Sequence, residues 1–220
     1  MAYFYTFWYT DHPCPVAVCS FPKWSQKMFK LRAQTPDEWA TVVADELDAF
    51  LPDHAAAERK ASANAMSLVV RYPDKLDLVD AMVEVAREEL EHFHQVFHLM
   101  RDRGVALEAD EPDPYVNGLL DHSRRGGSDR LLDRLLLGSI IEYRGCERFA
   151  MLGRELTARD EQPLGDFYRE LAASESKHRG DFYELALQYC DHDAVEKRLD
   201  EFLDVEARLV EELPIRPALH

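Results

Sequence analysis

The feature that most constrains this chain is a pair of Glu-x-x-His motifs, each set in an apolar stripe with helical spacing. The motifs are Glu89-Leu90-Glu91-His92 and Glu175-Ser176-Lys177-His178. Side chains three residues apart in an α-helix are offset by about 300° and therefore project from nearly the same face. Two such motifs on apolar faces predict that polar side chains meet inside a helical bundle, where unpartnered charges would be costly.

The register of the first motif has to be chosen, because Glu91-His92-Phe93-His94 also fits the pattern. Glu89 and His92 share a helical face with apolar residues, whereas Glu91 and His94 share theirs with polar and charged ones. We therefore expect Glu89 and His92 to point into the bundle. The second motif lies on a face that is apolar in the same way, with Phe167, Leu171, Ala172, Phe182 and Leu185.

Apolar residues recur at three- and four-residue spacing over five long segments, and each segment is expected to be a helix. Pro52 lies inside the first segment and is expected to kink its helix or to start it afresh. Residues 104–127 contain several prolines and glycines and are expected to form a long crossover, with a short helix around 115–122. The five segments cover approximately residues 36–71, 74–103, 128–156, 163–189 and 194–213.

Two short loops and one long crossover between helix pairs are typical of ferritin-like bundles. No segment alternates in the manner of a β-strand. The sequence therefore predicts an all-α, ferritin-like four-helix bundle with a long crossover, an additional C-terminal helix and an irregular N-terminal extension. We divide the chain into the extension at residues 1–35, the ferritin-like helical domain at 36–213 and a C-terminal tail at 214–220.

Composition and the N-terminal sequence indicate in which cellular compartment the protein acts and what it can bind. No stretch approaches the roughly 18 consecutive apolar residues of a membrane span. The N-terminus lacks the basic start and the cleavage site of a signal peptide. The four cysteines are scattered, as expected of reduced thiols. We therefore expect a cytoplasmic protein without membrane contact. The net charge of −16 argues against broad attraction to nucleic acid, but not against a local basic patch.

Two further carboxylates complete a set of candidate ligands. Glu58 lies on the apolar face of the first long helix, 31 residues before Glu89. On the third long helix Glu142 and Glu147 are alternatives, because five residues place them about 140° apart. The local sequence around Glu147 resembles that around Glu58, whereas the spacing favours Glu142, which precedes Glu175 by 33 residues. We take Glu142 and keep Glu147 as the alternative.

One Glu from each of two helices and a Glu-x-x-His motif from each of two others form the ligand pattern of di-iron carboxylate proteins. His54 lies one turn before Glu58 and is a further ligand, a residue that holds Glu58, or a packed side chain. Tyr143 and Glu147 are further candidates for supporting the ligands, although core packing is the simpler interpretation of Tyr143. The predicted ligands of two iron ions are Glu58, Glu89, His92, Glu142, Glu175 and His178.

At these residues the chain resembles the tRNA methylthio-isopentenyl-adenosine hydroxylases, the MiaE-like di-iron monooxygenases. The resemblance runs from about Leu31 to Leu213 and exceeds what metal binding alone demands. Its motifs are Pro52-Asp53-His54-Ala55-x-x-Glu58-Arg59-Lys60-Ala61, Arg87-Glu88-Glu89-Leu90-x-His92-Phe93, Ile141-Glu142-x-Arg144-x-Cys146-Glu147-Arg148-Phe149 and Ser174-Glu175-x-x-His178.

The resemblance implies O2-dependent hydroxylation of the isopentenyl group on the modified adenosine next to the anticodon. It implies the six metal ligands named above, two iron ions, and O2 as co-substrate. The implied partners are the tRNA anticodon stem-loop and an electron-donating reductase or ferredoxin. The alternatives are a ferritin-like ferroxidase, a di-iron oxidase or peroxidase acting on iron, peroxide or a small molecule, and a metal-free helical interaction domain.

A tRNA substrate requires a basic surface, and basic residues gather in two places. Lys23, Lys27 and Lys30 lie in a stretch near the N-terminus without acidic residues, with aromatic side chains among them. Arg124 and Arg125 lie on the predicted crossover. Both groups are candidates for contact with the tRNA, and an ordinary solvated surface is the alternative for each.

Overall fold

The computed structural model describes residues 29–127 and 129–220, and all of the secondary structure in these ranges is helical, as predicted. Lys23 and Lys27 lie outside the described residues. The helices are α1 (Glu38–Asp45), α2 (Leu47–Arg71), α3 (Leu76–Arg103), α4 (Pro114–Asp121), α5 (Asp129–Ala158), α6 (Gln162–Tyr189) and α7 (His192–Glu212).

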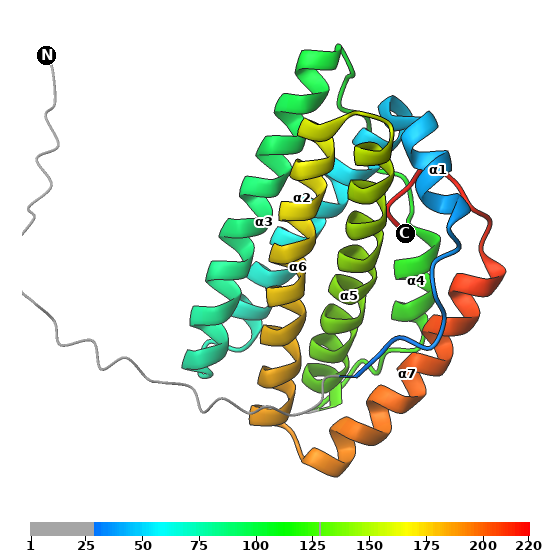
Figure 1. The fold of residues 1–220 in the computed structure, drawn as a ribbon. Helices are drawn as coiled ribbons and strands as arrows, with labels where there is room; N and C mark the ends of the chain where they lie inside the picture. Colours follow the sequence, from blue (N-terminus) through cyan, green and yellow to red (C-terminus); the bar gives the residue numbers. More distant parts are fainter. Residues whose placement is uncertain (1–28, 128) are drawn as a thin grey trace, which may run out of the picture.

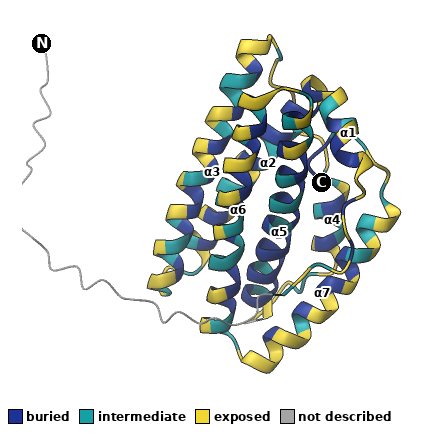
Figure 2. Cartoon of the chain, in the orientation of Figure 1, coloured by how far each residue is buried: buried dark blue, intermediate teal, exposed yellow. Residues whose placement is uncertain are grey.

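Four long helices form the bundle. Helix α2 packs against α3, α5 packs against α6, and the two pairs meet where α3 lies against α6. Figure 1 shows these four helices side by side, with α1, α4 and α7 along the outer side of α5. The chain between the pairs includes residues 104–127, the predicted crossover, and contains the predicted short helix α4. Figure 2 shows how thoroughly this arrangement buries α5, which has neighbours on both sides.

Local signals explain where several helices begin and end. Helix α3 ends at Gly104, which adopts a positive φ of 72° that favours glycine, and its N–H bonds back to the last turn. Helix α4 begins with Pro114 at its first position, and the Asp113 carboxylate accepts hydrogen bonds from the N–H groups of Tyr115 and Val116.

The first predicted helix is divided, and the position expected for the division is wrong. The new helix starts at Leu47, because Glu46 leaves the helical conformation with φ −118° and ψ 39°. Pro52 lies inside α2, where its missing N–H leaves the Asp48 carbonyl without the usual intrahelical bond. A single missing bond near the start of a helix is tolerated when the helix is held by packing on both sides of it.

The C-terminal tail packs against the bundle. The Trp39 Nε1–H donates to the Ala218 carbonyl over 3.0 Å, and the Leu219 N–H donates to Asp53 Oδ2 over 2.7 Å. Ala218 and Leu219 are both buried. The tail is therefore held by α1 through Trp39 and by α2 through Asp53.

Candidate metal centre

The structure brings together the six residues predicted as ligands. They come from α2, α3, α5 and α6, and every one of them is buried. Their ligand atoms form two overlapping groups, and within each group all atoms lie within 4.8 Å of one another. One group is Glu58, Glu89, His92 and Glu175, and the other is Glu89, Glu142, Glu175 and His178. Glu89 and Glu175 belong to both groups and would therefore contribute to both positions if two metal ions were bound.

The position of this cluster follows from the apolar pattern of each helix. The core consists of two apolar clusters, one on each side of the six polar residues along the bundle. On α3, for example, Ala86 belongs to one cluster and Val96 to the other, with Glu89 and His92 between them. Glu91 lies on the exposed face and its side chain accepts a hydrogen bond from Gln95, so the structure adopts the register that the sequence favours.

Around His92 the distances fit a shared cation better than a hydrogen-bonded network. His92 Nδ1 is 3.6 Å from Glu58 Oε2, 3.6 Å from Glu89 Oε2 and 3.5 Å from Glu175 Oε1. Ligands held at about 2.1 Å from one metal ion stand roughly 3.0–3.5 Å apart. Four buried ligand atoms have no hydrogen-bond partner among the described residues, namely Glu89 Oε1, His92 Nδ1, Glu175 Oε1 and His178 Nδ1.

The charges of the cluster also fit two divalent ions. Without metal, burial raises the pKa of Glu142 well above its usual value, and the nearby Glu175 raises it further. Burial opposes the charged form of His92, but Glu58 and Glu89 outweigh it and raise its pKa to about 10. For His178, Glu175 and Glu89 outweigh burial in the same way and raise the pKa to about 11. Two divalent cations would balance four carboxylates and would displace the protons from the inward-facing imidazole nitrogens.

His54 contacts one of the predicted ligands, the Glu58 carboxylate. Its Nε2 lies 2.8 Å from Glu58 Oε1, and its ring packs between those of Phe50 and Phe149. Burial would raise the pKa of Glu58, but the hydrogen bonds from His54 and His92 lower it to about 2. Of the three roles considered for His54, the structure shows contact with Glu58 rather than a place in either ligand group.

The two remaining candidates for support lie away from the cluster. The Glu147 carboxylate accepts hydrogen bonds from Thr35 and forms an ion pair with Arg144. The Tyr143 ring packs edge-on against Phe29 and under the Arg179 guanidinium, which is 4.2 Å from the ring centre. Neither side chain belongs to the two ligand groups, so Glu142, not Glu147, is the carboxylate that α5 places in the cluster.

Sequence reasoning missed Glu88. Its position next to Glu89 assigned it to the solvated face of α3, yet its Oε2 lies 2.8 Å from His178 Nε2 on α6. A histidine that binds metal usually donates its second N–H to a carboxylate or carbonyl. The only available signal was the second acidic residue directly before the motif, and that signal is weak in a chain with 42 acidic residues.

A ferritin-like bundle with four glutamates and two histidines converging at its centre defines the class of two-metal carboxylate proteins. The model of the family described as tRNA-(MS[2]IO[6]A)-hydroxylase (MiaE) matches residues 24–220. The chain therefore belongs to the MiaE family, and the resemblance predicted from the motifs is confirmed.

Two curated relatives and one solved structure are similar over most of this chain. A tRNA 2-(methylsulfanyl)-N(6)-isopentenyladenosine(37) hydroxylase of Pseudomonas putida is 36% identical over 82% of this chain and 86% of its own length. The hydroxylase of the same name from Salmonella typhimurium is 35% identical over 72% of this chain, which spans 57% of that longer relative. A Synechococcus protein with aldehyde deformylating oxygenase activity is 33% identical, with a TM-score of 0.79 over 88% of this chain and 96% of its own.

The predicted ferritin-like fold is confirmed by the helices and by this structural similarity. Among the described residues, no helix is both long and apolar enough to cross a membrane.

Proposed function

We propose that this chain is an O2-dependent di-iron monooxygenase that hydroxylates the isopentenyl group of methylthio-isopentenyl-adenosine next to the anticodon of tRNA. The observation that carries the proposal is the buried cluster of four glutamates and two histidines, in a chain that belongs to the MiaE family. Two iron ions held by these six residues would supply the O2-dependent oxidation of an allylic C–H bond.

The overall stoichiometry defines what else is required. One oxygen atom of O2 enters the C–H bond and the other leaves as water, so each turnover consumes two electrons and two protons. We propose a reductase or a ferredoxin as the source of the electrons. The side chains of the cluster contribute by binding and orientation. His54 holds Glu58, Glu88 holds His178, and the apolar clusters on either side keep water away from the site.

The direct test compares the modified nucleosides of tRNA by mass spectrometry. We expect the hydroxylated nucleoside in cells that contain the wild-type gene and methylthio-isopentenyl-adenosine, and only the unhydroxylated form in cells without the gene. Complementation with Glu175→Ala should fail, because this residue belongs to both ligand groups. Identical nucleoside profiles with and without the gene, in a host that makes the precursor, would count against a tRNA substrate.

A second candidate function is oxygenation of a small molecule. The observation in its favour is the similarity to the Synechococcus protein, whose description names aldehyde deformylating oxygenase activity. Purified protein loaded with iron and supplied with a chemical reductant should distinguish the two. Turnover of an aldehyde without tRNA supports the second candidate, whereas hydroxylation that requires the modified tRNA supports the first.

For tRNA docking we propose Arg125 and Lys30 as the contacts among the described residues. Lys30 is exposed, and Arg125 has no ion pair within the described part of the chain. Arg124 is already engaged, because its guanidinium pairs with Asp129 and with the fully buried Asp133. The structure therefore favours a structural role for Arg124, which fixes the crossover to the start of α5.

Charge reversal tests this assignment. We expect Arg125→Glu and Lys30→Glu to raise the KM for tRNA several-fold, and to reduce the salt slope by about 1 for each phosphate that the variant no longer binds. Iron content should not change. Arg124→Ala is the matched control, and it should lower the stability of the protein, since Asp133 would lose a partner. An unchanged KM in both reversed variants places the docking surface elsewhere.

A further inference from the structure

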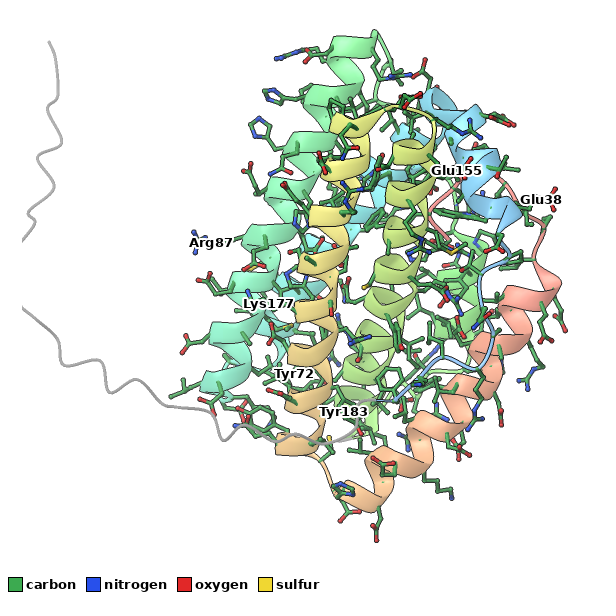
Figure 3. The ribbon with its side chains drawn as sticks, in the orientation of Figure 1. Glu38, Tyr72, Arg87, Glu155, Lys177 and Tyr183 are labelled. Atoms are coloured by element: carbon green, nitrogen blue, oxygen red, sulfur yellow. The ribbon has the colours of Figure 1, made fainter. Side chains whose placement is uncertain are left out.

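Glu88 links the candidate metal centre to the outer surface of the bundle. Its Oε2 lies 2.8 Å from His178 Nε2, and its Oε1 lies 2.6 Å from Lys177 Nζ. Glu88 is one-third exposed, whereas His178 is fully buried. Figure 3 shows Lys177 on the outer face of α6, on the side of α3. The lysine therefore fixes one carboxylate oxygen of Glu88 and leaves the other for the histidine.

This contact determines which nitrogen of His178 can bind metal. An ionised carboxylate only accepts hydrogen bonds, so the hydrogen between the two groups lies on Nε2 of His178. The lone pair of the neutral ring is then on Nδ1, which faces the cluster and lies 2.6 Å from Glu89 Oε1 without hydrogen-bond geometry. The carboxylate also makes the imidazole a stronger electron donor.

In the half of the cluster formed by Glu58 and His92, the carboxylate rather than the imidazole has a hydrogen-bond partner outside the ligand groups. No hydrogen bond to His92 Nε2 is present among the described residues, so this imidazole has no carboxylate behind it. The supported residue in that half is Glu58, which receives a hydrogen bond from His54 at 2.8 Å. A hydrogen-bond donor to a carboxylate ligand lowers the electron density on its oxygens. A carboxylate that accepts a hydrogen bond from an imidazole ligand raises the electron density on the ring. The two halves therefore have the same ligand types but unequal electron donation.

From this asymmetry we propose that Glu88 is a positioning residue that makes the two metal positions unequal. The position formed by Glu142 and His178 binds a divalent metal ion first and more tightly than the position formed by Glu58 and His92. This inference rests on the proposed two-metal centre, and it concerns the order in which that centre fills.

The test is an anaerobic titration of the metal-free protein with Fe(II). Calorimetry measures the binding steps, and Mössbauer spectroscopy distinguishes the two iron positions. For the wild type we expect two resolved binding steps. Glu88→Ala should weaken the tighter step by about 10- to 100-fold, the usual cost of losing such a partner, and should change the weaker step little. One of the two Mössbauer doublets should shift and the other should not. Glu88→Gln should recover part of the affinity, since its amide oxygen still accepts from Nε2.

Glu84→Ala is the matched control, because Glu84 lies one turn before Glu88 and, within the described part of the chain, pairs only with the exposed Arg87. It should leave both steps unchanged, and circular dichroism should show that every variant is folded. Two equal steps in the wild type, or an equal loss in both steps for Glu88→Ala, would overturn the inference while leaving the two-metal centre intact. A folded wild type that binds no iron would overturn the proposed function itself.

Discussion

Glu89→Ala should lose both iron ions, because Glu89 belongs to both ligand groups and cannot be replaced by a neighbour. The loss of affinity should exceed the roughly 10- to 100-fold cost of removing an outer hydrogen-bond partner. Elemental analysis after anaerobic reconstitution should give about two iron ions per chain for the wild type, the number held by di-iron carboxylate sites, and almost none for the variant. His178→Ala should retain at most one.

Stability measurements separate the loss of a ligand from the loss of the fold. Burial raises the pKa of Glu89 in the metal-free protein, which means that its charged form is poorly tolerated there. Metal-free Glu89→Ala should therefore melt close to the metal-free wild type, because removing a poorly tolerated buried carboxylate offsets the loss of a partner for His92 and His178. Iron should raise the melting temperature of the wild type only. Glu91→Ala should bind iron normally, since Glu91 is exposed. If it lost both ions, the choice of Glu89 and His92 over Glu91 and His94 as the inward pair would be wrong.

The two acidic residues of α5 provide a second comparison within the same experiment. Glu142→Ala removes a carboxylate of the cluster, so one metal position should be weakened or lost. Glu147 contacts Thr35 and Arg144 outside the cluster, so Glu147→Ala should keep two ions and lose some stability. If Glu147→Ala loses an ion and Glu142→Ala keeps both, then Glu147 is the ligand on α5, as the similarity of its local sequence to that around Glu58 indicates.

The bundle and its buried polar cluster could be predicted because both follow from repetition along single helices. A Glu-x-x-His motif on an apolar stripe constrains one helix by itself, and two such motifs imply that the helices face each other. Glu142 could be preferred over Glu147 only because helix pairs repeat at similar spacing. These arguments need no knowledge of how side chains meet across helices.

The supporting residues could not be predicted in the same way. Glu88 reaches His178 across the contact between α3 and α6, and periodicity assigns it to the polar face of its own helix. Likewise, Thr35 was not expected to meet Glu147 on α5, which is 112 residues away in the chain. The division of the first helix at Glu46, rather than at Pro52, also depends on how α1 turns to cover α5.

Arg144 is the largest fully buried side chain in the described part of the chain, and its surroundings could not be anticipated from sequence. Its Nε and Nη2 donate to Glu206 Oε1 on α7 over 2.8 and 2.6 Å, and Nη2 also donates to the Ala33 carbonyl. Tyr115 on α4 donates to the same carboxylate oxygen over 3.0 Å. The Arg144–Glu206 ion pair and its hydrogen bonds therefore join α4, α7 and the segment before α1 to α5.

Removing one partner of this pair should be strongly destabilising. In Arg144→Met the Glu206 carboxylate would remain buried with Tyr115 as its only partner, since its Oε2 already has none among the described residues. A broken buried ion pair typically costs about 3–5 kcal/mol. For a chain of this size that corresponds to a fall in the melting temperature of roughly 6–20 °C. Thermal and urea unfolding of the metal-free protein would measure both quantities.

The double variant Arg144→Met, Glu206→Leu should recover part of the lost stability, because it leaves no fully buried charge unpaired and both apolar side chains have similar volume to the residues they replace. Glu147 also loses Arg144, but its side chain is partly exposed and keeps its hydrogen bond from Thr35. Asp204→Ala is the control on the same helix. Asp204 pairs with Arg32 at the surface and is 60% exposed, so its removal should cost at most about 1 kcal/mol. If Arg144→Met costs no more than Asp204→Ala, the buried pair does not hold α7 on the bundle.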